Sequence, residues 1–186
     1  MKLRLSLCLS LAVAVLLLAS CDSAQSVSPD ETDNAFWPFE IGYSWTFHLD
    51  GGDDEDSTFT LEAADAAQDW YLLSDPEHRL VWSSLGDAIL FTDQWPPSLG
   101  DESSINVYLQ SPLVEGETWP LRLDGSGPDV ELVKADYTYQ TDHGDWEHCY
   151  KVSINSFWMV FSRGIGWVAE GYLNTEMTHL ISYDFD

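Results

Sequence analysis

GYSWTFHL, residues 42–49, is the stretch that decides the fold. Large apolar side chains occupy every second position, and small or polar residues stand between them. Successive side chains of a β-strand point to opposite faces of a sheet, so this alternation predicts a strand with one buried face. The folded part of the chain is therefore expected to start with β structure.

The same alternation returns along the rest of the chain, over residues 105–110, 133–140 and 176–185. Residues 70–73 and 88–91 are apolar at every position, which is typical of central strands. Gly, Pro and Asp residues separate these segments at short intervals, and only residues 63–69 have room for a helical turn. The sequence predicts a single all-β antiparallel domain of about ten short strands, arranged as a curved sheet, a sandwich or a barrel.

A different pattern precedes the strands. Lys2 and Arg4 make the start of the chain positive, and residues 5–20 are uncharged and mostly Leu, Ala and Val. This run is shorter than the roughly 20 residues that a membrane-spanning helix needs, and it is typical of the helical core of a signal peptide. The chain is therefore predicted to be exported.

The residues that follow, Leu18-Ala19-Ser20-Cys21, resemble the lipobox of bacterial lipoproteins. The resemblance implies that residues 1–20 are a signal peptide and that Cys21 becomes the first mature residue. It also implies that Cys21 carries acyl chains, palmitate among them, on its sulfur and usually on its amine. Two or more acyl chains give stable anchoring, so the expected location is the cell envelope, at a membrane surface facing the periplasm or the exterior.

Residues 21–34 are rich in Ser, Asp and Gln and contain hardly anything to bury. They are expected to form a flexible acidic linker between the lipid anchor and a folded domain over residues 35–186. Cys149 is the only cysteine expected in that domain, which excludes an intramolecular disulfide there. Nine Trp, eight Tyr and eight Phe supply the core instead.

The charge of the chain is strongly negative, with 7 Lys and Arg against 32 Asp and Glu and a formal net charge of −25. Nucleic-acid binding is excluded because phosphate contacts need a basic surface. Anionic lipid headgroups would also repel the chain, so the acyl tether must hold it at the membrane. An excess of acid favours a halophilic protein, whose self-repulsion is screened by salt; an ordinary acidic secreted protein is the alternative.

A Pro-x-x-x-Gly-x-x-Trp pattern occurs at residues 38–45 and again at 112–119, and its second half returns at 164–167. Glycine supplies a turn with positive φ, and the tryptophan that follows opens a strand and fills the core. Similar entries from loop to strand explain the repetition; a platform for an aromatic ligand is the alternative. The residues of this candidate ligand site are Trp45, Trp119, Trp158 and Trp167.

Two segments carry a second resemblance. Residues 36–47, FWPFEIGYSWTF, are similar to the Y-Y-P-L-x-x-G-x-x-W-x-Y opening of a diffuse group of bacterial lipoproteins of unknown function. Residues 157–168, FWMVFSRGIGWV, are similar to the W-F-A-x-G-V-G-x-V segment of the same group. The resemblance implies an all-β envelope domain, and it brings no catalytic residues with it.

Two segments are candidate cation sites. In residues 141–149, TDHGDWEHC, imidazole and carboxylate groups of the kind that bind Zn²⁺ are available from His143, Asp145, Glu147 and His148. No HExxH or CxxC spacing is present, and a hairpin with His-Gly at its tip is the alternative. The acidic residues 50–56, DGGDDED, are either a loop that binds Ca²⁺ or another divalent ion, or a solvated loop.

Motifs of nucleophilic catalysis and of phosphate binding are missing from the sequence, which has no G-x-S-x-G elbow and no glycine-rich loop leading into a helix. The sequence therefore predicts a non-enzymatic, lipid-anchored envelope protein with a binding or assembly role and without an organic cofactor, whose partner is a protein or an apolar small molecule. One alternative is a carrier or sensor that holds an apolar small molecule in a curved β-sheet. A metal-dependent hydrolase using residues 143–148 is the other.

Overall fold

The computed structural model describes residues 36, 40–49, 55–65, 70–76, 79–85, 88–96 and 101–185. The predicted signal peptide, Cys21 and the linker lie outside these residues, as do residues 50–54 of the acidic segment. In the described part of the chain, no helix has the length and apolar character needed to cross a membrane.

Within the described residues, twelve strands form one antiparallel sheet, which confirms the all-β prediction. The strands are β1 (Ser44–Leu49), β2 (Glu55–Asp65), β3 (Trp70–Ser74), β4 (Arg79–Leu85), β5 (Ala88–Thr92), β6 (Asn106–Leu109), β7 (Thr118–Pro120), β8 (Asp129–Thr141), β9 (Gly144–Ile154), β10 (Phe157–Ser162), β11 (Gly166–Tyr172) and β12 (Thr175–Asp184). A short 3₁₀ helix, Glu102–Ser104, precedes β6. Residues 63–65, part of the one segment with room for a helical turn, belong to β2 because they pair with residues 70–72 of β3.

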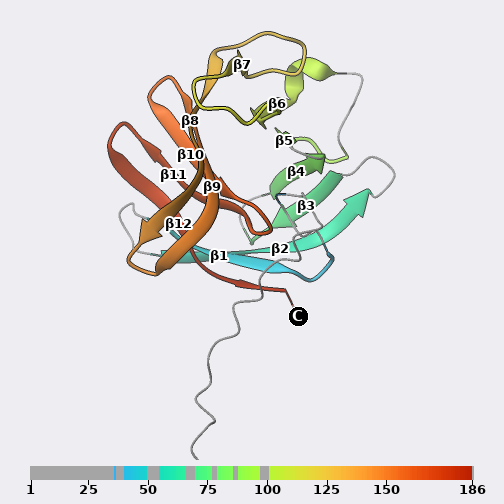
Figure 1. Ribbon diagram of the computed structural model, residues 1–186. Coiled ribbons are helices and arrows are strands. Elements are labelled where there is room, and N and C mark those ends of the chain that lie inside the picture. Colours follow the sequence, from blue (N-terminus) through green and yellow to red (C-terminus); the bar gives the residue numbers. More distant parts are fainter. Residues whose placement is uncertain are drawn as a thin grey trace, which may run out of the picture. The chain divides into compact units, whose positions relative to one another are not determined.

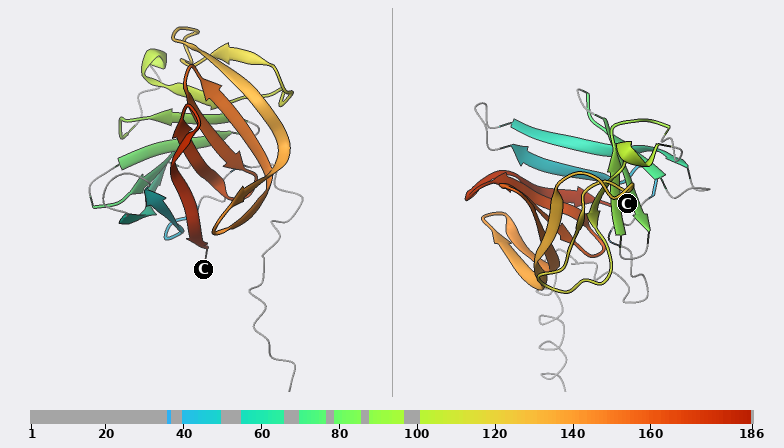
Figure 2. Two further views of the ribbon diagram at one scale, coloured as in Figure 1. Left: turned by 90° about the vertical axis from the view of Figure 1, so that its left-hand side faces the viewer. Right: turned by 90° about the horizontal axis from the view of Figure 1, so that it is seen from above.

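The strand order is β6-β5-β4-β3-β2-β1-β12-β11-β10-β9-β8-β7. Neighbours in the sheet are therefore neighbours in the chain, except that β1 lies beside β12. The sheet curls until β8–β12 face β3–β6, with β1 and β2 joining the two sides (Figures 1 and 2). Its ends almost meet, because Asn106 forms an isolated bridge with Arg122 and the Val107 amide donates to the Leu121 carbonyl over 2.6 Å. The result is a nearly closed barrel.

The inner face of the sheet holds the core. In β1, Trp45 and Phe47 are 0% and 1% exposed, whereas the alternating residues Ser44 and Thr46 are half-buried. This confirms the predicted alternation over residues 44–47, but Leu49, which was predicted on the buried face, is 36% exposed at the end of the strand. Full burial of each large apolar side chain contributes roughly 1.5–3 kcal/mol, so the alternation of a single strand is a substantial part of the stability.

The recurring Gly-x-x-Trp pattern has the backbone geometry predicted for it. Gly42 and Gly116 have φ angles of 102° and 87°, in the region that favours glycine. The tryptophan that follows each of them is buried. Trp45 also connects the first copy of the pattern to the third, since its indole N–H donates to the Ile165 carbonyl over 2.8 Å.

Candidate functional site

All four candidate ligand-binding tryptophans are buried in the core, and three of them have a partner for the indole N–H. In these three the indole N–H donates to a backbone carbonyl: Trp45 to Ile165 over 2.8 Å, Trp119 to Val107 over 2.9 Å and Trp158 to Leu173 over 3.0 Å. Buried indole N–H groups need such partners, so these bonds fix the orientation of the rings. The structure does not bring these three together as one platform.

Trp167 on β11 differs from the other three. Its Nε1 atom is buried and has no hydrogen-bond partner in the described part of the chain. It lines an open cleft of about 170 Å³ that the structure forms between β4–β6 and β10–β11, on opposite sides of the barrel. We call this the aromatic cleft; its lining residues are Leu80, Trp82, Phe91, Tyr108, Phe157, Met159, Trp167 and Glu170.

One wall of the aromatic cleft is a cluster of three rings. The Trp82 ring centroid lies 4.9 Å from that of Phe91 and 5.7 Å from that of Tyr108, and the Phe91 and Tyr108 centroids are 5.9 Å apart. The ring planes are tilted by 40° to 54° to one another. Trp82 and Phe91 are also register partners on β4 and β5, so the sheet itself holds them side by side.

Glu170 is the one carboxyl group among the residues that line the aromatic cleft. It is half-buried, and no other described residue forms a hydrogen bond or ion pair with it. Burial raises the pKa of Glu170 to about 7, because the ionised form loses hydration. Burial also raises the pKa of Tyr108 to about 12, and the negative charge of Glu170 adds to that effect. Near neutral pH the cleft therefore holds a carboxyl group that exchanges readily between its two forms.

The four candidate metal ligands of residues 143–148 lie on one hairpin, made by β8 and β9. His143 is at the exposed turn, where its amide donates to the Thr141 hydroxyl over 3.2 Å. His148 points elsewhere and its Nδ1 lies 2.8 Å from a carboxylate oxygen of Asp136. These two residues have φ angles of 51° and 48°, so the regular alternation that would align the four side chains is broken there.

Asp145 and Glu147 do not join His143 in a ligand set. Within the described residues, no group of three or more His, Cys, Asp or Glu side chains is placed to hold a metal ion as it stands. Cys149, the next residue of interest on β9, is fully buried, and burial raises the pKa of its thiol to about 11. The described residues therefore do not form the four-ligand set that the sequence suggested.

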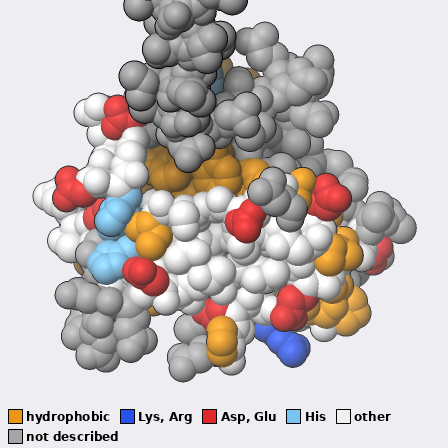
Figure 3. Space-filling view, turned by 90° about the horizontal axis from the view of Figure 1, so that it is seen from below, with side chains coloured by type: hydrophobic (Ala, Val, Ile, Leu, Met, Phe, Trp, Pro, Cys, Tyr) orange, Lys and Arg blue, Asp and Glu red, His pale blue; other side chains and the backbone are white. Residues whose placement is uncertain are grey.

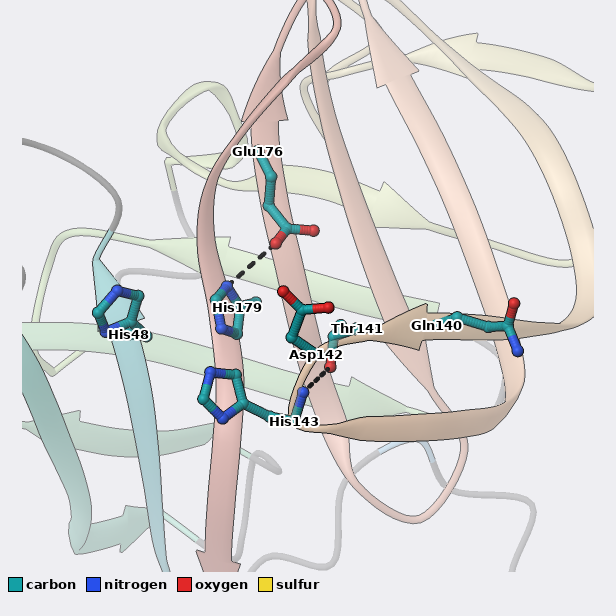
Figure 4. Close-up of a pocket in the computed structure, with 7 residues that line it drawn as sticks. All are labelled: His48, Gln140, Thr141, Asp142, His143, Glu176 and His179. Carbon is teal, nitrogen blue, oxygen red and sulfur yellow. Dashed lines mark hydrogen bonds and ion pairs between the residues drawn. The ribbon is translucent and has the colours of Figure 1, made fainter.

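His143 instead lies beside two histidines from distant parts of the chain. His48 on β1 and His179 on β12 are register partners, and the β8–β9 turn brings His143 next to them (Figure 4). Figure 3 shows histidine side chains gathered beside acidic ones on the face seen from below. We call this the histidine recess; it has a volume of about 390 Å³ and is lined by His48, Gln140, Thr141, Asp142, His143, Glu176 and His179.

Sequence reasoning did not group the three histidines, and it named none of the cleft residues except Trp167. His48 and His179 are register partners only because the first and last strands of the barrel pair, which no local pattern indicates. Glu170 stands between Ala169 and Gly171 as a single acid in a mostly buried strand, and that unusual position is the one local signal that could have marked it.

Comparison of the chain with protein-family models, with curated proteins and with solved structures finds no match. A fold by itself does not determine a function, because one architecture serves many activities. We therefore infer function from the chemistry of the aromatic cleft and the histidine recess.

Proposed function

We propose that this chain is a lipid-anchored protein of the cell envelope whose β domain binds a compact ammonium compound in the aromatic cleft, without catalysing a reaction. The observation that carries the proposal is the half-buried carboxyl of Glu170 among the rings of Trp82, Phe91, Tyr108 and Trp167. Aromatic faces attract cations, with about 0.5–2 kcal/mol for each favourable contact. A carboxylate on the same cleft adds direct charge complementarity.

The size of the cleft limits the ligand. At about 170 Å³ it is smaller than the sites of drug-sized ligands, which span roughly 300–1,000 Å³. The cleft is small for a fatty acyl chain, and its size favours a compact head group. The proposal therefore changes the ligand of the carrier hypothesis drawn from the sequence, from an apolar small molecule to a small cation with an apolar surface.

The charge of the whole chain supports a cationic ligand. A formal net charge of −25 attracts small cations and raises their concentration near the surface. The expected anchor at Cys21 and the linker of residues 21–34 would hold the cleft close to a membrane while leaving it open to solvent. Under this proposal the protein collects or senses its ligand at the cell envelope.

A titration with a matched pair of probes tests the proposal. Choline and its neutral isostere 3,3-dimethylbutan-1-ol have nearly the same shape and differ in charge. We expect choline to change the tryptophan fluorescence of the full chain, and we expect its affinity to rise as the pH passes about 7, where Glu170 ionises. The isostere should bind at least about tenfold more weakly, since each 1.4 kcal/mol is a factor of ten.

The control for the probe pair is a pair of variants. Glu170→Gln should weaken choline binding at least about tenfold, whereas Glu131→Gln, an exposed acid on β8, should leave it unchanged. Equal binding of both probes would overturn the ammonium proposal in favour of a purely apolar ligand. No binding of either probe, or equal losses in the two variants, would contradict a specific role for Glu170.

A further inference from the structure

The histidine recess is independent of the aromatic cleft and has a different chemistry. Three of the chain's five histidines meet there, from β1, from the β8–β9 turn and from β12. Imidazole is a ligand that suits Zn²⁺, Cu²⁺ and Ni²⁺. We propose that His48, His143 and His179 form a binding site for a divalent transition-metal ion, with Zn²⁺ as the reference ion.

The spacing of the three rings fits such a site. The ring centroids of His143 and His179 are 4.9 Å apart, those of His48 and His179 are 5.3 Å apart, and those of His48 and His143 are 6.3 Å apart. Zinc–nitrogen bonds near 2.1 Å with tetrahedral angles place the centroids of three imidazole ligands about 5 Å from one another. The backbone therefore already holds the rings at nearly the separation that one shared ion requires.

The carboxylates around the recess orient two of the rings. Nδ1 of His48 lies 2.9 Å from an oxygen of Asp56, and Nδ1 of His179 lies 3.0 Å from an oxygen of Glu176. A carboxylate at Nδ1 favours the tautomer that carries its proton there and its lone pair on Nε2. Metal-binding histidines characteristically have this arrangement, with a carboxylate behind the ring.

Among the described residues the three rings are not arranged as a metal-ligand set, so binding of an ion requires them to rotate. The ring planes are inclined by 26° to 44°, so the rings partly stack on one another and their nitrogens do not converge on one point. His143 is exposed and lies at the β8–β9 turn, beside His48 and His179 (Figure 4), so its side chain is the least constrained of the three. Asp142 and Glu176 add negative charge to the recess, and water or one of them would complete a four-ligand site.

Zinc binding to the full chain, purified without a polyhistidine tag, tests this proposal. Equilibrium dialysis should show one Zn²⁺ bound per chain in the presence of excess Mg²⁺, which occupies the nonspecific acidic sites. His143→Ala should weaken Zn²⁺ binding at least about tenfold, since even the loss of a supporting partner costs 10–100-fold. Because His143 is exposed, this variant should fold normally.

The matched control is His148→Ala, which removes a second exposed histidine from the same hairpin but outside the recess. It should bind Zn²⁺ as the unaltered chain does. A second readout is the visible spectrum of the Co²⁺ complex, whose intense tetrahedral bands should be lost in His143→Ala and in His179→Gln. Absence of tight Zn²⁺ binding, an unchanged His143→Ala variant, or equal losses in the control and His143→Ala would each overturn the site.

Discussion

Replacing Glu170 with Gln should change how the stability of the protein depends on pH. The folded-state pKa of Glu170 is about 7, above its ordinary value of 4.5, because burial penalises the ionised form. The folded chain therefore holds this proton more tightly than the unfolded chain does. The stability that comes from the neutral carboxyl is present in full below pH 4.5 and is lost as the pH rises through about 7.

The size of the effect follows from the shift in pKa. A rise from 4.5 to about 7 corresponds to about 3 kcal/mol in total, at 1.36 kcal/mol for each pKa unit. About 2 kcal/mol of this falls between about pH 5.5 and about pH 8.5, where the unfolded form is already mostly ionised and the folded form titrates. Glu170 is partly exposed, so screening by solvent brings the expected change toward about 1 kcal/mol.

Urea unfolding of the full chain at about pH 5.5 and about pH 8.5 measures this change directly. The free energy of unfolding of Glu170→Gln, minus that of the unaltered chain, should increase by about 1–2 kcal/mol at the higher pH. Effects of packing and of the other acids are common to both pH values and cancel in this comparison. Glu131→Gln is the control, because it removes an exposed negative charge without altering the cleft. An increase no larger than that of the control would refute the reasoning.

Two further expectations concern packing and reactivity. A Cβ atom at Gly171 would overlap the Trp158 ring and the neighbouring backbone, so Gly171→Ala should lower the free energy of unfolding by about 2–3 kcal/mol. An unchanged midpoint in urea would contradict this close approach. Burial raises the pKa of Cys149 to about 11, so alkylation at that residue near pH 8 should be slow in the folded chain and fast in urea. Peptide mass spectrometry after timed alkylation measures both rates, and equal rates would contradict the burial.

The two proposed sites are tested by independent experiments. Loss of choline binding in Glu170→Gln says nothing about zinc, and loss of zinc in His143→Ala says nothing about the aromatic cleft. Glu170 lies on β11 and His143 at the β8–β9 turn, and the aromatic cleft and the histidine recess share no lining residue. Either proposal can therefore fail while the other stands.

Several strands could be predicted because their signal is local. The alternation of residues 42–49 reflects the two-residue period of the strand backbone, and it required no knowledge of partners. The turn geometry of Gly42 was predictable for the same reason, since positive φ strongly favours glycine. The strand at residues 63–65 was missed because its pairing with β3, and not its own residue preferences, holds it extended.

The sequence by itself determined that the chain is an acidic, aromatic-rich all-β protein, and it predicts an exported and lipid-anchored one. Only the tertiary structure decided which side chains meet. The pairing of β1 with β12 places His48 opposite His179, and the curl of the sheet brings Trp82 and Glu170 to one cleft. Periodicity records which face of a strand is buried, but not which strand lies opposite. That choice depends on the packing of the whole barrel, whose contacts link residues far apart in the chain.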